Sequence, residues 1–595
     1  MQKSQRFSAD LRFYLTGRIG ALLLLVSLAA GMVVGDARLW SERVRTEVFD
    51  CYHQLSPRKR ISQPVTIVAI DDQSLSALGQ WPWPRTLLAR LVNTIMAAKP
   101  AALGIDIIFP EPDRYSPGNI DQHVSRIPSE LLSRLKQLPP NDDIFASALS
   151  GKPVVLGFAG MDNGRYGNSG GYTPFMVRGT EKELTSSFLR RFEGALHSIN
   201  ILEMAAAGRG FLSVDLENGI ARRVPLVATI AGTLAPSFDL ELLRVVTDAS
   251  SVALETDRWG AAAVGVGDLR LPVGSDGRFW VYFSPHDAGR FVSARDILDG
   301  KIPTERLQNR LVLLAVTGIG MVDYPTSPLG EYIPGVEVHA QILENVFDNT
   351  FLTRPFFARY LETALLLLLG SVFIVMIPRI RPTPAIIGGV ALIFVTVTLG
   401  FVLFCMKGIL FDFVTPAVGT CLVFALLLWD GYKRTEEERR LIARQLAVEK
   451  EQAARLAGEL EAASRIQLGF LPDMATALRG ATNVDLYASM VPAREVGGDL
   501  YDFFILPGER LFFIVGDVSG KGLPASLFMA VSKVLCKSIA QQHSNSLEEM
   551  LSTANGLLTE NNPELLFLTA FVGVLDLRTG ELVYSNAGHD FPYII

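Results

Sequence analysis

The sequence has few cysteines, few charges and no excess of basic residues. Its 595 residues include only four cysteines, at positions 51, 405, 421 and 536, and their spacing matches no zinc or redox motif. Charged residues make up 19 % and the net charge is −6, so nucleic acid is not expected as a partner. Hydrophobic residues reach 49 %, which points to membrane segments, and the length predicts several domains.

Four apolar runs predict transmembrane helices over residues 19–35, 361–377, 384–406 and 409–429. Residues 1–18 carry four cations, at positions 3, 6, 12 and 18, and we expect such a basic flank to stay in the cytoplasm. A cleaved signal peptide is the alternative for the first run, because small residues at 29–31 offer a cleavage site. For the other three runs the alternative is buried helices of a soluble core.

Basic residues between and after these runs predict the orientation. Arg379 and Arg381 separate the second run from the third, and Lys433 with Arg434 follows the last, so both places are expected inside. Residues 36–355 are then exported, and the C-terminal part lies in the cytoplasm of a multi-pass inner-membrane protein. Arg354 and Arg359 fall on the outer side and count against this orientation.

The exported segment, residues 36–355, has an α/β pattern. A strand over 65–70, a helix over 84–98 and a strand over 103–109 are followed much later by a strand over 311–316, and the first and second strands are expected to be parallel. Asp71, Asp72, Asp106 and Asp323 lie in or after these strands. They predict a ligand or cation site, with helix capping and loop contacts as the alternative.

Four stretches of this segment resemble a known module. They are VTIVAIDDQSLSALGQWPWPR (65–85), ALGIDIIFPEPD (102–113), DLENGIARRVPL (215–226) and SPLGEYIPGVEVHAQILENVF (327–347). Together they resemble the extracellular sensory domain called CHASE, type 2. The resemblance implies sensing of a signal that it does not identify, in a chain with an N-terminal anchor, three further spans and a cytoplasmic output domain.

Residues 430–470 change abruptly to Glu, Arg, Ala, Gln and Leu, which predicts a long surface helix. A weak apolar seam runs through positions 446, 453, 456, 460, 463 and 466. We interpret it as a marginal coiled coil that makes a homodimer and passes on a rotation or register shift. A solvated single helix is the alternative.

The last part, residues 471–595, carries two aspartate motifs. In EVGGDLYDFF (495–504) Asp499 follows Gly498, and in LFFIVGDVSGKGLPASLFM (511–529) a strand over 511–515 ends at Gly516 and Asp517. Carboxylate and carbonyl oxygens suit Mg²⁺ and Mn²⁺, and glycine lets the backbone approach an ion closely. Asp499 and Asp517 are therefore the predicted ligands, with Gly498 and Gly516 supporting them.

These strings, with SRIQLGFLP (464–472) and FLTAFVGVLDLRTGELVYSNAGHDFPY (567–593), resemble the SpoIIE-type branch of the metal-dependent serine/threonine phosphatases, the PPM or 2C-like family. The resemblance implies an α+β fold, an α-β-β-α sandwich, with two Mg²⁺ or Mn²⁺ ions. By that likeness Asp517 bridges both ions, Asp499 binds one, and the Val518 carbonyl adds a ligand. The substrate implied is a phosphorylated regulatory protein, typically an anti-anti-sigma protein.

One departure from the family concerns the end of the sequence. The family's remaining metal-binding aspartates lie beyond NAGH (586–589), whereas this sequence stops at Ile595. We therefore expect an incomplete dinuclear site and little phosphatase activity from this piece. A non-catalytic scaffold is one alternative. A GGDEF-like nucleotide cyclase is another, although GDVSGKG does not belong to that pattern.

Three further residues of this part have two readings each, and a fourth has one. His589 is a general acid or a structural residue, and Lys521 meets a phosphate or lies in a solvated turn. Cys536 is expected in the core. Asp502 is an acid behind the metal ligands or an ordinary turn residue.

Overall fold

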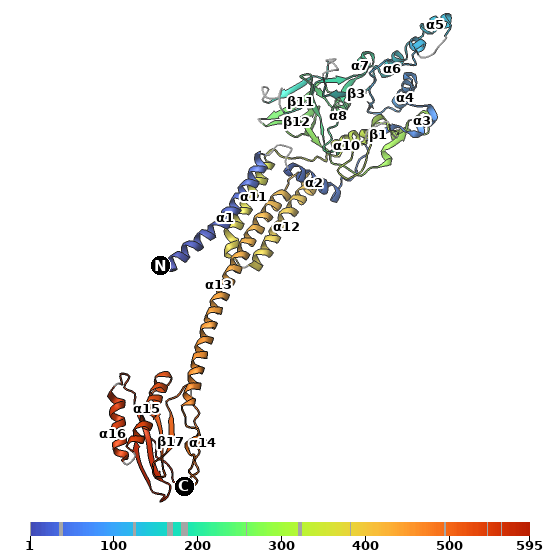
Figure 1. Ribbon diagram of the computed structural model, residues 1–595. Helices are drawn as coiled ribbons and strands as arrows, with labels where there is room; N and C mark the ends of the chain where they lie inside the picture. Colours follow the sequence, from blue (N-terminus) through green and yellow to red (C-terminus); the bar gives the residue numbers. More distant parts are fainter. Residues whose placement is uncertain are drawn as a thin grey trace. The chain divides into compact units, whose positions relative to one another are not determined.

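The computed structural model describes the whole chain except residues 1, 35–39, 123–126, 164–170, 180–187, 258, 319, 321–323, 381, 493–495, 544–545 and 561. It divides into two compact units, Met1–Tyr432 and Lys433–Ile595 (Figure 1). Gly35, Asp323 and Arg381, which the sequence analysis used, lie outside the described residues.

A parallel sheet forms the centre of the N-terminal unit. Its strands run in the order β15-β1-β16-β2-β3, with β7 parallel to β3 and β6 antiparallel to it. Their bounds are β1 Val65–Ile70, β2 Ala102–Asp106, β3 Val154–Met161, β6 Gly194–Leu196, β7 Gly208–Phe211, β15 Phe291–Ser293 and β16 Leu311–Val316. The first two predicted strands are parallel, as expected, but β16 lies between them.

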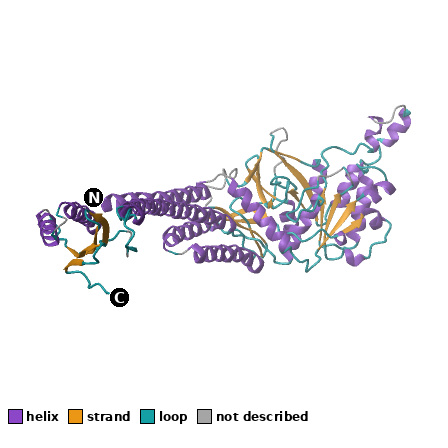
Figure 2. Ribbon diagram, turned by 60° about the horizontal axis from the view of Figure 1, so that its bottom comes forward, coloured by secondary structure: helices purple, strands orange, loops and turns teal. Residues whose placement is uncertain are grey.

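Helices cover both faces of this sheet (Figure 2). Along β1, Val65 and Ile67 join one hydrophobic core, and Val68 and Ile70 join the other, as the two-residue period of a strand requires. Burial on both faces explains why these strands are continuous apolar runs. One face carries α3 Asp72–Leu78, α4 Arg85–Ala97, α6 Asn141–Leu149 and α9 Ala294–Leu298, and the other carries α8 Phe238–Val246 and α10 Gly335–Phe347.

Smaller sheets and helices complete this unit. One sheet has the order β13-β12-β11-β4, another has the order β10-β9-β5, and β14 pairs with β8. The bounds are β4 Phe175–Arg178, β5 Arg190–Phe192, β8 Arg223–Pro225, β9 Val227–Ile230, β10 Thr233–Pro236, β11 Val252–Asp257, β12 Gly260–Val266, β13 Leu269–Pro272, β14 Arg278–Trp280, α2 Trp40–Leu55, α5 Ser129–Leu135 and α7 Asn200–Ala205.

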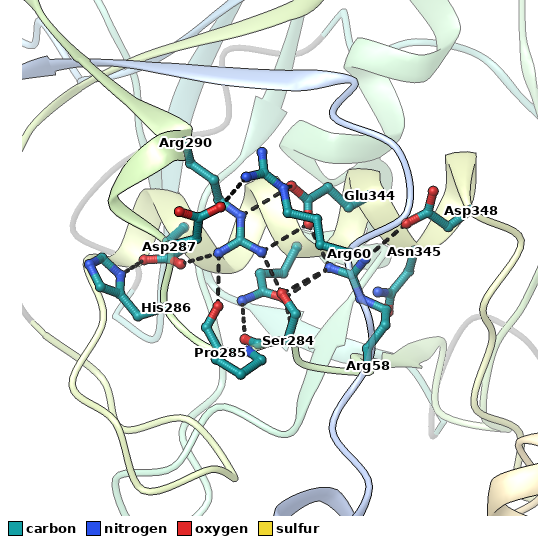
Figure 3. Close-up of polar contacts among 12 residues, drawn as sticks. Arg58, Arg60, Ser284, Pro285, His286, Asp287, Arg290, Glu344, Asn345 and Asp348 are labelled. Carbon is teal, nitrogen blue, oxygen red and sulfur yellow. Dashed lines mark hydrogen bonds and ion pairs between the residues drawn. The ribbon is translucent and has the colours of Figure 1, made fainter.

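A buried network of arginines and carboxylates joins the segment after α2 to α10 (Figure 3). Arg58 donates to Glu344 at 2.6 Å and to Asp348 at 3.0 Å. Arg290, which is fully buried, donates to Glu344 at 3.0 Å and to Glu337 at 2.6 Å. Because each buried charge has an opposite charge beside it, the network closes without an isolated ion.

In the part of the chain that the structure describes, five helices are long and apolar enough to cross a membrane. Four of them are α1 Gln2–Val34, α11 Ala358–Met376, α12 Pro382–Lys407 and the start of α13 Val414–Gly469. The helix α13 begins at Val414 rather than Ile409, because Ile409 bridges to Thr353 and the Asp412 carboxylate caps the helix by accepting from the Thr415 amide at 2.9 Å. It then continues as one helix to Gly469, one residue short of the end of the predicted linker, 430–470.

The fifth apolar helix, α15 Leu523–Gln542, belongs to the core of the C-terminal unit. There it packs with α16 Leu547–Glu560 against a four-stranded antiparallel sheet of order β17-β18-β19-β20. The strands are β17 Leu500–Leu506, β18 Arg510–Val518, β19 Leu568–Asp576 and β20 Leu582–Ala587, and a short helix, α14 Met474–Ala477, precedes them. The described residues form one helical layer on one sheet, so the α-β-β-α sandwich stays a prediction.

Candidate metal centre

The two predicted metal ligands lie on neighbouring strands. Asp499 directly precedes β17, and Asp517 lies within β18, which pairs antiparallel with β17 from Leu500 opposite Gly516 onwards. The prediction that β18 ends at residue 515 was wrong. The strand continues to Val518, because β19 supplies partners for Asp517 and Val518.

Two glycines allow the backbone to approach this place closely. A Cβ atom added to Gly498 would lie 2.8 Å from the Val518 carbonyl oxygen and 3.4 Å from Asp517 Oδ1. One added to Gly516 would lie 2.6 Å from the Thr569 carbonyl oxygen. A side chain at position 498 would collide with the Val518 carbonyl, and one at position 516 would collide with the Thr569 carbonyl. This gives a steric reason for glycine in both motifs.

The charges of the two carboxylates act on each other. The pKa of Asp499 is raised by partial burial and by the charge and hydrogen bonding of Asp517. Both aspartates remain exposed, so a cation can reach them. An opposite charge placed between them would relieve the repulsion, and carboxylate and carbonyl oxygens are the donors that Mg²⁺ and Mn²⁺ prefer.

The donor set is small. Within the described part of the chain, no group of three or more His, Cys, Asp or Glu side chains could hold a metal ion. The oxygens of Asp499, Asp517 and the Val518 carbonyl fit a hard divalent cation as part of its ligand shell.

His589 lies beside this pair and has a partner. Its Nδ1 is 3.0 Å from Thr569 Oγ1, which in turn donates to the Asp517 carbonyl at 3.2 Å. Asn586 also fixes the histidine backbone through two hydrogen bonds. These contacts favour the structural reading of His589. Thr569 was missed by sequence reasoning, because only strand pairing brings it to a residue 52 positions earlier in the chain.

The end of α13 contacts the loop that leads to Asp499. The buried side chain of Gln467 donates to the Gly497 carbonyl at 2.5 Å and accepts from the Gly497 amide at 3.0 Å. Lys533 of α15 donates to the Phe470 carbonyl just after the helix. Sequence reasoning did not single out Gln467, although it lies in one of the strings that carried the resemblance.

The remaining candidates of this unit have mostly structural surroundings. Asp502 lies buried in β17, with Lys533 at 3.8 Å and Lys537 at 3.6 Å, so it is not a turn residue. Cys536 is in the core as predicted, and burial raises the pKa of its thiol to about 11. Lys521 is exposed in the turn between β18 and α15.

Among the described residues of the N-terminal unit, the acidic side chains do not form a group of three or more that could hold a metal ion. Asp71 caps α3 by accepting from the Ser74 amide at 2.8 Å, as the alternative reading held, and it also accepts from the Ser293 hydroxyl. Asp72 lies in the first turn of the same helix. Asp106 is on the sheet beside His339 and Asp239, and burial raises its pKa.

Family comparison decides the nature of the N-terminal unit. The CHASE2 domain model matches residues 21–377, which is more than half of the sequence. The chain belongs to the CHASE2 family. A second family, stage II sporulation protein E (SpoIIE), matches residues 507–595, so both resemblances found in the sequence are confirmed. The SpoIIE match includes Asp517 and Val518 but begins after Asp499. With its apolar helices, this CHASE2 chain is a membrane protein of several domains.

The relatives of this CHASE2 chain cover only a small part of it. Protein IcfG of Synechocystis is 30% identical over 163 residues, 23% of this chain and 25% of that protein. The phosphoserine phosphatase RsbU of Bacillus subtilis is 28% identical over 132 residues, 22% of this chain and 38% of RsbU. The crystal structure of the RsbU and RsbW domains of Rv1364c from Mycobacterium tuberculosis is 30% identical over 17% of this chain and 27% of that one, with a TM-score of 0.15. The chain thus spans well under half of the curated relatives.

Proposed function

We propose that this protein is a membrane receptor whose CHASE2 domain senses an extracytoplasmic signal and whose C-terminal unit removes phosphate from phosphoserine or phosphothreonine. The observation that carries the proposal is the meeting of Asp499, Asp517 and the Val518 carbonyl at two strands of a SpoIIE-like sheet. The similarity to RsbU, a phosphoserine phosphatase, supports the reaction class. By the same likeness, the substrate is a phosphorylated regulatory protein of the anti-anti-sigma type.

Each site residue has a distinct role in this proposal. Asp517 and Asp499 hold Mn²⁺ or Mg²⁺, with the Val518 carbonyl as a further oxygen ligand. A divalent cation bound there supplies a Lewis acid that makes water more acidic and neutralises charge on the phosphoryl group. Gly498 lets the backbone before β17 come close to the Val518 carbonyl, and Gly516 lets β18 lie close to Thr569 of β19. The Thr569 and His589 pair braces the strand that carries Asp517.

The membrane arrangement is part of the same proposal. Four helices, over residues 19–35, 361–377, 384–406 and 409–429 as read from the sequence, cross the inner membrane. Residues 36–355 then lie outside, and the linker 430–470 and the phosphatase domain, 471–595, lie inside. The basic residues at 379, 433 and 434 support this orientation.

The linker part of α13 supports a homodimer. Leu446, Leu456 and Ile466 of the predicted seam are each at least half exposed in the single chain. A second copy of the same helix would cover them in a two-stranded coil. The full chain in membranes, cross-linked through a cysteine introduced at position 456, should give a dimer that a cysteine on the opposite face does not give.

Manganese binding by the full-length protein in detergent tests the catalytic part. We expect Asp517→Asn to weaken Mn²⁺ binding about 100-fold, equivalent to about 2.7 kcal/mol, because it removes a charged ligand and the repulsion that favours a cation. Asp485→Asn is the matched control, since Asp485 is an exposed carboxylate of the same unit. Electron paramagnetic resonance of Mn²⁺ measures the affinity, and phosphate release from a phosphoserine peptide measures the reaction.

The two readouts separate the candidate functions. Mn²⁺ binding with phosphate release, both lost in Asp517→Asn, supports the phosphatase. Mn²⁺ binding without release supports the non-catalytic scaffold. Equal Mn²⁺ affinity in the wild type and Asp517→Asn would remove the metal site and the proposal with it.

A further inference from the structure

A cleft of about 450 Å³ lies where the CHASE2 domain meets the apolar helices. Its walls come from α2, from the β12, β13 and β14 strands, and from residues 352–359, which lead into α11. The volume lies within the range of about 300–1,000 Å³ that is typical of small-molecule sites. Among the described residues, the charged lining consists of four arginines, at positions 45, 223, 354 and 359, and three carboxylates, at positions 42, 257 and 276.

Three of the four arginines are held by close carboxylates of the chain. Arg354 donates to both oxygens of Glu362 at 3.0 Å, and Arg45 donates to Glu42 at 2.7 Å. Arg223 pairs with Glu217 and lies 3.4 Å from Asp276. Because carboxylates of the chain hold their guanidinium groups in place, these three arginines form fixed parts of the cleft wall.

Arg359 is different, because its contacts are long. Its guanidinium lies 3.4 Å from Glu42 Oε1 and 3.5 Å from the Val33 carbonyl, and its side chain is 35% exposed. The same Glu42 oxygen already accepts the shorter bond from Arg45. A guanidinium carries five N–H donors in a planar fork, so Arg359 keeps donors for an anion that enters the cleft.

The aromatic residues Trp259 and Phe356 line the cleft, and Tyr360 lies beside them. Trp259 stacks on Phe356 at 5.5 Å between ring centroids, and Tyr360 of α11 is 6.4 Å from the same indole. Phe356 and Tyr360 are about half exposed. Tryptophan and tyrosine are enriched where a transmembrane helix leaves the hydrocarbon, and α11 begins at Ala358. If α11 crosses the membrane, residues beside its first turn lie near the level of the lipid headgroups.

We propose that this cleft binds the phosphate-bearing headgroup of an anionic membrane lipid in the leaflet next to the CHASE2 domain. Arg359 binds the phosphate, and Trp259 with Phe356 covers the glycerol backbone and the first part of the acyl chains. Phosphate recognition by a planar arginine fork and burial of apolar chain against aromatic rings are both favourable. The site also explains two arginines on the side of the membrane where the orientation rule expects few.

A lipid bound in the cleft would be connected by side-chain contacts to α13, the helix that leads to the C-terminal unit. Arg354 borders the cleft and pairs with Glu362, and Glu362 also accepts from the Asp412 amide at 2.8 Å. Asp412 caps α13. The inference requires that the apolar helices cross a membrane, but it does not require a phosphatase, so the two proposals fail in separate experiments.

The full-length protein in lipid nanodiscs tests the site. Nanodiscs of phosphatidylcholine alone are compared with nanodiscs that also contain phosphatidylglycerol, and lipid retention is measured by native mass spectrometry. We expect selective retention of phosphatidylglycerol, and about tenfold weaker retention in Arg359→Gln, which corresponds to about 1.4 kcal/mol. Arg270→Gln is the control, because Arg270 is an exposed arginine of β13 paired with Glu255 away from this cleft.

A second readout needs no variant and stays valid if Arg359→Gln folds poorly. Brominated phosphatidylglycerol should quench the tryptophan fluorescence of the wild type more strongly than brominated phosphatidylcholine does. Equal quenching and equal retention of the two lipids would overturn the proposal. Inorganic phosphate or glycerol phosphate is added to protein in phosphatidylcholine nanodiscs as a separate arm. Binding of these soluble anions without selectivity for phosphatidylglycerol would assign the cleft to a soluble phosphate compound and overturn its assignment to a lipid.

Discussion

Two groups of charged residues in this molecule differ in burial and in whether opposite charges surround them. In the CHASE2 domain, Arg58 and Arg290 are buried, and each has carboxylates within 3.0 Å (Figure 3). In the C-terminal unit, the carboxylates of Asp499 and Asp517 are exposed, and partial burial together with the charge and hydrogen bonding of Asp517 raises the pKa of Asp499. The first group is complete within the chain, whereas the second forms the proposed metal site, where a bound cation would relieve the repulsion between the two carboxylates.

The difference separates charges that hold a fold together from charges that bind something. A buried ion pair costs solvation, so it persists only when every member has its counter-charge and hydrogen bonds. Two like charges placed side by side near solvent cost stability unless an opposite charge joins them. The second arrangement therefore fits the cation that we propose for it, and the first needs no ligand.

The largest expected effect is the loss of one member of the buried network. Glu344→Gln should lower the free energy of unfolding of the CHASE2 domain by about 3–5 kcal/mol, because it leaves the two buried guanidinium groups of Arg58 and Arg290 without their shared carboxylate. Denaturant unfolding of the full chain, followed by tryptophan fluorescence, measures it. Glu255→Gln, which breaks the exposed pair with Arg270, should change the same quantity by less than about 1 kcal/mol. Equal effects of both variants would show that burial does not distinguish these pairs.

A second buried pair should make the stability depend on pH. His339 of α10 lies 2.9 Å from Asp239 of α8, next to Asp106. Although burial opposes protonation, the two carboxylates raise the pKa of His339 to about 9. The unfolded chain has the ordinary value near 6.5. This pair therefore contributes its full stability below about pH 6.5 and loses it as the pH rises through about 9.

The free energy of unfolding should fall by about 3 kcal/mol between these limits. His339→Gln should remove most of this fall. Unfolding curves measured at pH 6 and pH 9 for both proteins check the sign, and an unchanged fall in the variant would contradict it.

Features set by local sequence patterns could be predicted from the sequence, whereas features set by pairing between distant segments could not. The strands at 65–70 and 311–316 and the two glycine-aspartate motifs could be read from the sequence, because each is a short run with its own period or spacing. The length of β18 could not be read, because the partners of Asp517 and Val518 lie on β19, at least 50 residues away in the sequence. Arg58 and Glu344 are 286 positions apart, and nothing in either local pattern indicates that they meet. Contacts between residues far apart in the sequence decide which charges have a partner, and local spacing gives no information about these contacts.

A smaller effect is expected at the glycine beside the two aspartates. Gly498→Ala places a Cβ 2.8 Å from the Val518 carbonyl, so we expect about tenfold weaker Mn²⁺ binding, or about 1.4 kcal/mol. Gly556→Ala in α16 is the control, because no atom lies within 4 Å of its added Cβ, and it should leave Mn²⁺ binding unchanged. The Mn²⁺ affinity of both variants, measured by electron paramagnetic resonance, tests this. Equal affinities would mean that the close approach at Gly498 has no part in metal binding.

The smallest expected effect connects α13 to the same site. Gln467 is bonded to the backbone of Gly497, two residues before Asp499, and it is buried on a helix whose neighbouring residues are largely exposed. Gln467→Ala should weaken Mn²⁺ binding about threefold, or about 0.7 kcal/mol, because the loop that carries Asp499 loses two fixed contacts. Gln452→Ala, an exposed glutamine on the same helix, should have no effect. If Gln467→Ala lowered the unfolding free energy but left Mn²⁺ affinity unchanged, Gln467 would only attach the helix. A change in Mn²⁺ affinity would show that Gln467 connects α13 to the exposed pair of Asp499 and Asp517.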